Sequence, residues 1–409
     1  MERVNWKSAL MYGRPETTLR LNRRRVPCRP LCSLLVSLAA GLPLSSCSDP
    51  DEAADADADA DTDTDADTDA DTGTATGVWG LEGIELNAVW GRSADEVYAS
   101  GRDLDFRIAF LAFDGIRWRR LAVEIPDGNE LNGLFAAGPS PGALWGVGRC
   151  ADDPGLGLIA RYDGAAWQAE RCKGGILSSI WASPDGAVVF AVGSGYAGWE
   201  LAPPDLLSRS EASAWISVEL GVGPAGLADI WGASSDAVYA VGHVRSDDDS
   251  RWDSVIVRHD GAAWAAETHD LRGALEGVWG SGSDDVYAVG CLRDTEDGRA
   301  VIAHHDGAGW SDVAADGDFP GIWLEDVWGT AGDDVYAVGW SLPADTREGV
   351  ILHFDGAAWR EVHRLPDHEL RAVWASGPDD VYAVGRGAGR AQILHSDGQA
   401  WVAMDLSGV

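Results

Sequence analysis

The sequence predicts an all-β fold built from tandem repeats, and three observations favour this class. A motif of the Val-Trp-Gly type recurs along the chain at an almost constant interval. Glycine is frequent (51 of 409 residues) and tryptophan unusually so (20), which is typical of short strands, tight turns and aromatic packing. Apolar residues within the repeats alternate with a period of two, which excludes helical repeats of similar length.

The clearest copy of the repeat runs from Val278 to Trp310. It contains Val-Trp-Gly, then Asp-Asp-Val-Tyr-Ala-Val-Gly, and finally an Asp-Gly turn followed by a tryptophan. The aromatic residues of the first phrase, 45 to 50 residues apart, are Trp90, Phe135, Trp181, Trp231, Trp279, Trp328 and Trp374. The closing tryptophans are Trp118, Trp167, Trp215, Trp264, Trp310, Trp359 and Trp401. Both sets have seven members, so seven units are predicted within residues 78–409.

Each unit contains four short runs rich in Val, Ile, Tyr and Trp, which indicate four antiparallel strands. Asp-Gly closes the last hairpin of a unit because it supplies the positive φ of a tight turn. Two buried tryptophans contribute about 10 kcal/mol per unit, whereas ordering one unit costs at least about 50 kcal/mol, so no unit is stable alone. We therefore predict a closed seven-bladed β-propeller whose shared Trp and Tyr residues form the core.

Residues 1–46 are predicted to be a secretory signal. Arginines at positions 23 to 25 and 29 precede an apolar stretch from Leu31 to Pro43, which is too short to span a membrane. The next residues, Leu-Ser-Ser-Cys47, resemble the lipobox of bacterial lipoproteins. That resemblance implies lipidation of Cys47 and, because Ser48 follows it, an outer-membrane location facing the periplasm or the cell surface. The alternative is an ordinary signal peptide with an incidental cysteine.

Residues 47–77 are predicted to form a disordered spacer, because eleven Asp and one Glu alternate with Ala and Thr between Asp49 and Asp71. A calcium loop is disfavoured there, since the turn glycine and the closing glutamate of such loops are missing. The formal net charge is −35, and it becomes −41 once residues 1–46 are removed. Nucleic acid and anionic membrane surfaces are therefore disfavoured as partners, and the lipid on Cys47 is the only expected membrane contact.

The phrases Val-Trp-Gly, Asp-Asp-Val-Tyr-Ala-Val-Gly and His-Phe-Asp-Gly-Ala-Ala-Trp resemble tandem repeats in secreted proteins and lipoproteins of myxobacteria. The resemblance covers residues 78–409 and implies the propeller fold but no particular activity. A weaker similarity extends to kelch and sialidase-type propellers, whose Asp-box is similar to the Asp-Gly-x-x-Trp turn. The serine of that box is replaced by His304, His353 or His395, so no sialidase residue carries over.

Recognition residues are expected in the loops after strands two and four, because these loops open on one face and vary between units. Tryptophan beside arginine is typical of interface hot spots and of sugar-binding sites. The candidate ligand-binding residues in these loops are Tyr196, Trp199, Trp252, Trp323, Trp340, Arg245 and Arg251. The alternative is that these aromatic residues pack against their own loops.

Histidines and cysteines suggest local structure. His304, His353 and His395 recur at one position of strand three, on blades too far apart to share a metal, so we predict local hydrogen bonds and no metal site. Cys150 and Cys172 are predicted on the same face of one blade, where an oxidising compartment would allow a disulfide.

No catalytic residue and no cofactor are predicted, because the sequence shows no nucleophile with a base in a recognisable frame and no phosphate-binding loop. We therefore expect a monomeric, non-enzymatic binding or scaffold lipoprotein that presents its variable-loop face to a protein partner. A lectin-like carbohydrate-binding propeller is the first alternative. A polysaccharide hydrolase or lyase is the second, and an arginine cluster facing carboxylates at the mouth of the central channel would favour it.

Overall fold

The computed structural model describes 81–125, 128–136, 144–150, 156–171, 175–194, 196–197, 200–201, 204–210, 214–223, 225–246, 251–292, 298–314, 319–343, 346–407 and 409. All of them lie in one compact unit, Thr74–Val409. The predicted signal 1–46, the lipidation site Cys47 and the spacer up to residue 77 lie outside the described residues. Every regular element in the described ranges is a β-strand, and they contain no helix long and apolar enough to cross a membrane.

The strands fall into seven sets of four, which we number as blades 1 to 7. The first strands are β1 (Glu85–Ser93), β5 (Gly128–Ala136), β9 (Ile176–Ala182), β15 (Ala225–Ser234), β19 (Ala274–Gly282), β23 (Ile322–Ala331) and β27 (His368–Gly377). The second strands are β2 (Glu96–Arg102), β6 (Leu144–Cys150), β10 (Val188–Ser194), β16 (Ala237–Arg245), β20 (Asp285–Leu292), β24 (Asp334–Ser341) and β28 (Asp380–Gly387).

The outer half of each blade follows the same order. The third strands are β3 (Ile108–Phe113), β7 (Gly157–Tyr162), β13 (Asp205–Ser210), β17 (Trp252–His259), β21 (Arg299–His305), β25 (Glu348–Phe354) and β29 (Arg390–Ser396). The fourth strands are β4 (Trp118–Arg120), β8 (Trp167–Arg171), β14 (Ile216–Ser217), β18 (Trp264–Ala266), β22 (Trp310–Asp312), β26 (Trp359–Pro366) and β30 (Trp401–Ala403). A small hairpin of β11 (Tyr196–Ala197) and β12 (Glu200–Leu201) precedes β13.

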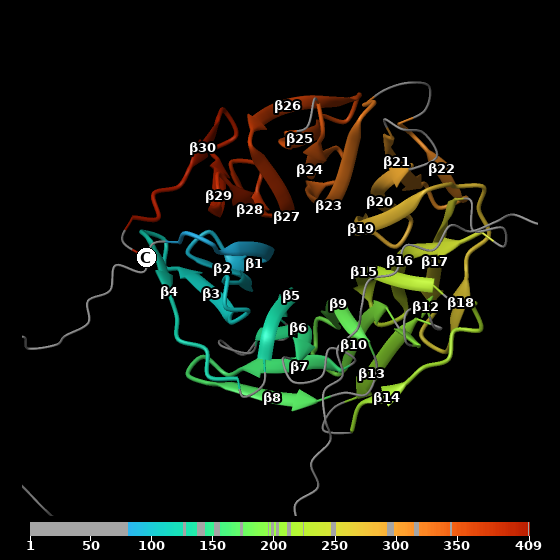
Figure 1. The fold of residues 1–409 in the computed structure, drawn as a ribbon. Coiled ribbons are helices and arrows are strands. Elements are labelled where there is room, and N and C mark those ends of the chain that lie inside the picture. The colour runs from blue at the N-terminus through green and yellow to red at the C-terminus, as the bar shows by residue number, and fades with distance from the viewer. Residues whose placement is uncertain are drawn as a thin grey trace, which may run out of the picture. The chain divides into compact units, whose positions relative to one another are not determined.

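Within each blade the strands pair in sequence order as an antiparallel meander. Blades 3 and 4 are joined into one eight-stranded sheet by a single pair, Ser194 opposite Gly226. Figure 1 shows the first strands around a common axis and the fourth strands at the periphery. The predicted all-β propeller class is therefore confirmed, and the pairings are compatible with the predicted seven blades.

The ring closes between the two ends of the described unit. Residues preceding β1 pair with blade 7, where Glu82 bridges Arg390 and the Gly83 N–H donates to the Gly389 carbonyl at 2.8 Å. Inside the ring, the Trp90 indole of blade 1 lies 6.4 Å from that of Trp374 in blade 7.

The closing tryptophans hold neighbouring blades together. Each packs edge-on against an aromatic ring of the preceding blade, with interplanar angles of 73° to 88°. The pairs are Trp118–Tyr382, Trp167–Phe110, Trp215–Trp145, Trp264–Phe190, Trp310–Tyr239, Trp359–Tyr287 and Trp401–Tyr336. Such pairs contribute about 0.5–1.5 kcal/mol beyond the area they bury. The predicted core role of these residues is confirmed, and Trp118–Tyr382 repeats the contact across the closure.

The glycine of Val-Trp-Gly is explained by the inner aromatic residues. A Cβ on Gly280 of blade 5 would lie 2.8 Å from the indole of Trp231 in blade 4, closer than real side-chain atoms approach. Gly91 meets Trp374 in the same way, and Gly329 meets Trp279. The motif thus brings the main chain of one blade directly against the tryptophan of the blade before it.

The polar residues of the repeat make local contacts. His304 Nε2 lies 2.7 Å from the Asp285 carboxylate of its own blade, and its ring stacks on Tyr287 at 4.3 Å. Equivalent His–Asp pairs occur at His353 and His395, so the predicted local hydrogen bonds are confirmed.

Candidate functional site

A β-bulge recurs in the first strand of every blade, three residues before the inner aromatic residue. In blade 5, Leu275 pairs with Gly290 and Gly277 with Val289, so Glu276 has no partner in the ladder. The residues skipped in this way are Asn87, Asn132, Ser178, Ala228, Glu276, Glu325 and Arg371. A bulge re-aims a side chain out of the regular alternation, and all seven residues line the central channel.

The glycine that ends Ala-Val-Gly in strand two makes this bulge possible. A Cβ on Gly290 would overlap the main-chain oxygen of Ala274 on the neighbouring strand. The same overlap arises with the opposite strand at Gly101, Gly148, Gly193, Gly242, Gly290, Gly339 and Gly385. A side chain cannot be accommodated there, because the obstructing atom belongs to the backbone. The repeat therefore specifies both the bulge and the direction of the residue it carries.

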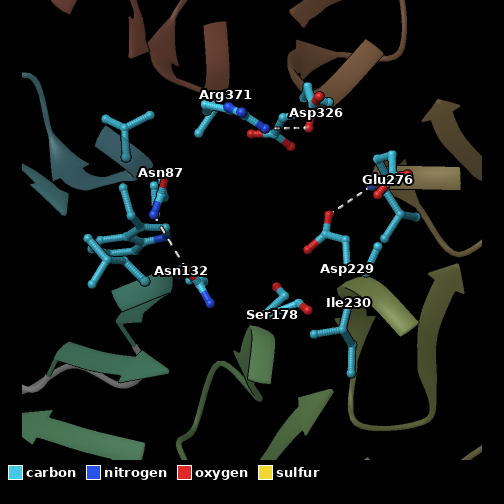
Figure 2. Close-up of a pocket in the computed structure, with 18 of the residues that line it drawn as sticks. Asn87, Asn132, Ser178, Asp229, Ile230, Glu276, Asp326 and Arg371 are labelled. Atoms are coloured by element: carbon cyan, nitrogen blue, oxygen red, sulfur yellow. Dashed lines mark hydrogen bonds and ion pairs between the residues drawn. The ribbon is translucent and has the colours of Figure 1, made fainter. Parts of the chain in front are cut away.

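The channel holds a polar cavity of about 140 Å³ beneath a wider mouth of about 440 Å³. The inner aromatic residues, among them Trp90, Phe135 and Trp231, line the deeper part. Figure 2 shows the labelled polar side chains directed into one opening, with Asn87 and Asn132 on one side and Asp229 and Glu276 on the other. The bulge is repeated in every blade, whereas the side chain that it directs into the channel differs between blades.

One side of the mouth carries a chain of ion pairs, which we call the arginine arc. It comprises Arg102, Arg149, Arg347, Arg371 and Arg386 with Glu85, Glu130, Glu325 and Glu369, from blades 6, 7, 1 and 2. Arg102 contacts Glu85 of its own blade at 3.3 Å and Glu130 of the next blade at 3.2 Å. Ion pairs within one blade are thus linked to ion pairs between neighbouring blades.

Two of the four carboxylates of the arc are more deeply placed than its guanidinium groups. The side chain of Glu369 is only 6% exposed and that of Glu130 only 8%, whereas Arg386 and Arg347 are 39% and 40% exposed. Burial alone would raise the pKa of Glu369, but hydrogen bonds from Arg386 and Arg347 hold that pKa below its usual value. The arc therefore keeps Glu130 and Glu369 beneath its guanidinium groups, whereas Glu85 and Glu325 are exposed to a degree similar to that of the arginines.

Three further carboxylates, which we call the acidic wall, are Asp229, Glu276 and Asp326 from blades 4 to 6. Glu276 lines the mouth, whereas the two aspartates line the deeper cavity, and Figure 2 shows Asp326 beside Arg371. The Asp229 carboxylate accepts the N–H of Val278 at 2.8 Å, and Asp326 accepts that of Val373, also at 2.8 Å. Burial raises the pKa of Asp229, and burial together with the negative charge of Asp229 raises that of Asp326 well above its usual value. Among the described residues that line the cavity, the basic ones belong to blades 1, 2 and 7.

Trp323 and Trp340 form a cross-strand pair in blade 6 beside the arc. Their rings stack at 4.6 Å with an interplanar angle of 12°, and the Arg347 guanidinium lies 4.3 Å from the Trp340 ring. The Trp340 indole N–H donates to Glu325 at 2.7 Å, and Gly298 of blade 5 packs on Trp323. Both faces of Trp340 are therefore covered by the protein itself.

Trp252 and Arg245 are also a cross-strand pair, in blade 4. The Arg245 guanidinium lies 4.1 Å from the Trp252 ring, and the His243 ring meets the same indole edge-on at 4.6 Å. Arg251 forms an ion pair with Asp253 at 2.9 Å. The sequence placed Trp252, Arg245 and Trp340 in loops and Trp323 after a fourth strand, but the strands continue through these positions because the residues pair across the ladder.

Of four other predicted residues, only Cys150 has a described side chain. Tyr196 begins β11, but its side chain is not among those described, and Trp199 lies outside the described residues. Cys172 lies outside them as well, whereas Cys150 is buried at the end of β6, and its Sγ donates to the Gly157 carbonyl at 3.8 Å. The Cys150–Cys172 disulfide stays a prediction.

An exposed apolar turn follows strand two of blade 1, directly after Arg102. Asp103 Oδ1 accepts the N–H groups of Asp105 and Arg107, at 3.0 and 2.9 Å, which fixes the turn. Leu104 is 79% exposed and Phe106 is 55% exposed, and Phe106 adopts a positive φ of 56° that side-chain-bearing residues rarely adopt. Strain of this kind tends to mark functional segments.

Sequence reasoning did not identify the channel residues. The sequence does contain a signal for them. The position three residues before each inner aromatic residue varies among Asn, Ser, Ala, Glu and Arg, whereas the motif around it is nearly constant. Within the described ranges, no three His, Cys, Asp or Glu side chains converge so as to hold a metal ion.

The fold and this channel define a β-propeller, and comparison with known proteins supports that class. No protein-family model matches the chain, and no curated protein sequence matches it. The crystal structure of Sqt1 from Saccharomyces cerevisiae is similar, with 10% sequence identity, a TM-score of 0.51, and coverage of 79% of this chain and 85% of that one. A structure of streptogramin B lyase is similar at 11% identity, with a TM-score of 0.53 and coverage of 76% and 93%.

Identities this low establish the fold alone. One of the two relatives is named as a lyase, so the shared fold is consistent with either binding or catalysis. The resemblance of the repeats to those of myxobacterial lipoproteins stays a prediction.

Proposed function

We propose that this protein is a binding propeller that presents the mouth of its central channel to a protein partner. The observation that carries the proposal is the turn after Arg102, which holds Leu104 and Phe106 in solvent beside the arginine arc. Exposed apolar side chains next to arginine and tryptophan are typical of interface hot spots. On the same face, Leu342 follows β24 and is 47% exposed.

A carbohydrate-binding function at the predicted aromatic residues is less well supported. Sugar stacking requires an open indole face, but Trp340 lies between Trp323 and Arg347. Trp252 is covered by Arg245 on its face and by His243 at its side. These residues support the mouth by packing rather than by offering a platform for a ring.

A polysaccharide hydrolase or lyase is the second candidate function. Part of the arginine arc lines the mouth together with Glu276, and Asp229 and Asp326 lie deeper in the channel, which is the arrangement that favours this alternative. Incubation of the full chain with neutral and uronic-acid polysaccharides, followed by a reducing-end and an unsaturated-product assay, tests it. Turnover that is lost in Glu276→Gln would replace the binding function by catalysis.

The protein-binding proposal is tested by photo-crosslinking in the cells that produce the protein. A photoreactive phenylalanine analogue is placed at Phe106 or, as a control, at Ile116, which is 87% exposed in the hairpin turn on the opposite face. We expect a discrete adduct of higher mass from position 106, reduced by Leu104→Asp, and none from position 116. Equal adducts from both positions, or none from position 106, would contradict the proposal.

The tether is part of the same proposal. Lipid on Cys47 would anchor the chain to the outer membrane, and the acidic spacer up to residue 77 would hold the propeller away from the surface. The spacer contains about 31 residues, so at roughly 3.3 Å each it reaches at most about 100 Å. This length lets the mouth face approach a partner in solution or in the same membrane.

A further inference from the structure

We propose that the channel mouth binds a zwitterionic group, with its positive charge against the acidic wall and its negative charge against the arginine arc. The inference rests on the proposed function and names the chemistry that the partner presents there. A lysine at the carboxyl terminus of a partner protein and a free amino acid derivative share this chemistry.

The first support is the uneven placement of charge around one opening. The arc contains five guanidinium groups and four carboxylates, and the two carboxylates of Glu130 and Glu369 lie beneath the arginines. Arg371 lines the cavity itself and reaches Glu325 at 3.4 Å and Glu369 at 2.9 Å. A ligand carboxylate can join such a network because guanidinium has more N–H donors than two carboxylates use.

The second support is the acidic wall. Asp229 and Asp326 each accept a main-chain N–H from the following blade, which orients their carboxylates but brings no positive charge. Glu276 stands beside them on the bulge of blade 5. Burial raises the pKa of both aspartates, and an ammonium group between them would supply the positive charge that their main-chain donors lack.

A purely structural role would explain only part of this arrangement. The aspartates do connect neighbouring blades, but other blades have Ala88, Gly133 and Ala372 at the corresponding position and still belong to the ring. Glu276 and Arg371 sit on bulges that the backbone forms equally well around Ala228 or Ser178. Charge at these positions is therefore not needed for the fold.

The experiment uses isothermal titration calorimetry on the full chain with matched probes. The probes are ω-amino acids from 4-aminobutanoate to 8-aminooctanoate, with hexylamine and hexanoate as single-charge controls of the same length. We expect one ω-amino acid to bind at least about tenfold more tightly than either control, because both charges then contribute charge-assisted hydrogen bonds. The preferred chain length reports the separation between wall and arc.

Three variants locate the site. Glu276→Gln and Arg371→Gln are each expected to weaken the preferred probe at least about fivefold. Glu276→Gln should leave hexanoate binding unchanged, and Arg371→Gln should leave hexylamine binding unchanged. Ser178→Ala, at the same bulge of blade 3, is the uncharged control and should change the affinity less than twofold. Circular dichroism confirms that each variant is folded before titration.

The outcomes separate the inference from the proposed function. Equal binding of hexylamine and the best ω-amino acid, or no binding by any probe, overturns the zwitterion site even if Phe106 crosslinks to a partner. Competition by the ω-amino acid against the crosslink at position 106 supports the terminal lysine of a partner as the source. Probe binding without any effect on the crosslink supports a free small zwitterion instead.

Discussion

Replacement of Gly290 by alanine tests whether the repeat glycine exists to make the channel bulge. The added Cβ would overlap the carbonyl oxygen of Ala274, and no rotamer change can relieve an overlap with backbone. The strand must move, which opens the bulge between Leu275 and Gly277 and redirects Glu276 away from the channel. One methyl group thus acts on both the stability and the site.

The size of the effect follows from the ladder. Opening the bulge disturbs the pairs Leu275 with Gly290 and Gly277 with Val289, and each hydrogen bond contributes about 0.5–1.5 kcal/mol net. Overpacking of a rigid site adds about 1–3 kcal/mol. We therefore expect the free energy of unfolding to fall by about 2–6 kcal/mol, which lowers the melting temperature by about 3–9 °C in a unit of roughly 330 residues.

Thermal melting followed by circular dichroism measures this loss, with Gly282→Ala as the matched control in the same blade. Gly282 has no heavy atom within 4 Å of its virtual Cβ and no positive φ. Alanine there should be neutral or should stabilise by about 0.4–1 kcal/mol through the unfolded chain. If Gly290→Ala melts within about 2 °C of the unchanged protein, the role assigned to this glycine is wrong.

Three other substitutions have expected outcomes of different kinds. Trp310→Ala removes the indole that packs edge-on against Tyr239 at 6.0 Å, so thermal melting should show a loss of about 3–5 kcal/mol, largely recovered by Trp310→Phe. Asp326→Asn tests the raised pKa of that residue. Because folded Asp326 keeps its proton to higher pH than the unfolded chain, the stability of the unchanged protein falls as pH rises through that raised pKa. Denaturant titrations should therefore show that the free energy of unfolding of Asp326→Asn, relative to that of the unchanged protein, rises from about pH 4 to pH 8. A difference in this free energy that stays constant with pH would contradict the assigned pKa shift. Cys47→Ser should abolish labelling by radioactive palmitate and release the protein from the membrane fraction, whereas unchanged labelling would exclude this cysteine as the lipid site.

The scaffold was predictable because its determinants repeat. The inner and closing aromatic residues occur at the same place in each unit, so their periodicity predicts strands, a core and a ring. Trp310 against Tyr239 and Trp359 against Tyr287 show how one contact recurs between successive blades. The histidine contacts were predictable for the same reason, since a residue that recurs on separate blades must find its partner locally.

The site was not predictable to the same degree because a bulge breaks the alternation on which strand assignments depend. Glu276 and Arg371 sit where regular pairing would turn a side chain away from its observed direction, and only the register shift aims them into the channel. The surroundings of the aromatic candidates were not predictable either. Trp252 and Trp340 stand out in composition, and the sequence contains no sign that Arg245 and Arg347 cover them.

The mouth of the channel shows how a repeated backbone can carry side chains that differ from blade to blade. One cross-strand position holds Glu–Arg in blades 1, 2 and 7 and Trp–Trp in blade 6, but small or uncharged pairs such as Ala274–Cys291 in blade 5. None of these pairs includes the glycines of Val-Trp-Gly or the closing tryptophans, which pack one blade against the next, so the pairs can differ without opening the ring. A ligand that enters the mouth therefore meets the arginine arc and Glu276, and Asp229 and Asp326 lie deeper in the channel. Because these charges differ from blade to blade, a zwitterionic ligand of the kind proposed would bind in a single orientation, which a ring of seven identical blades would not impose.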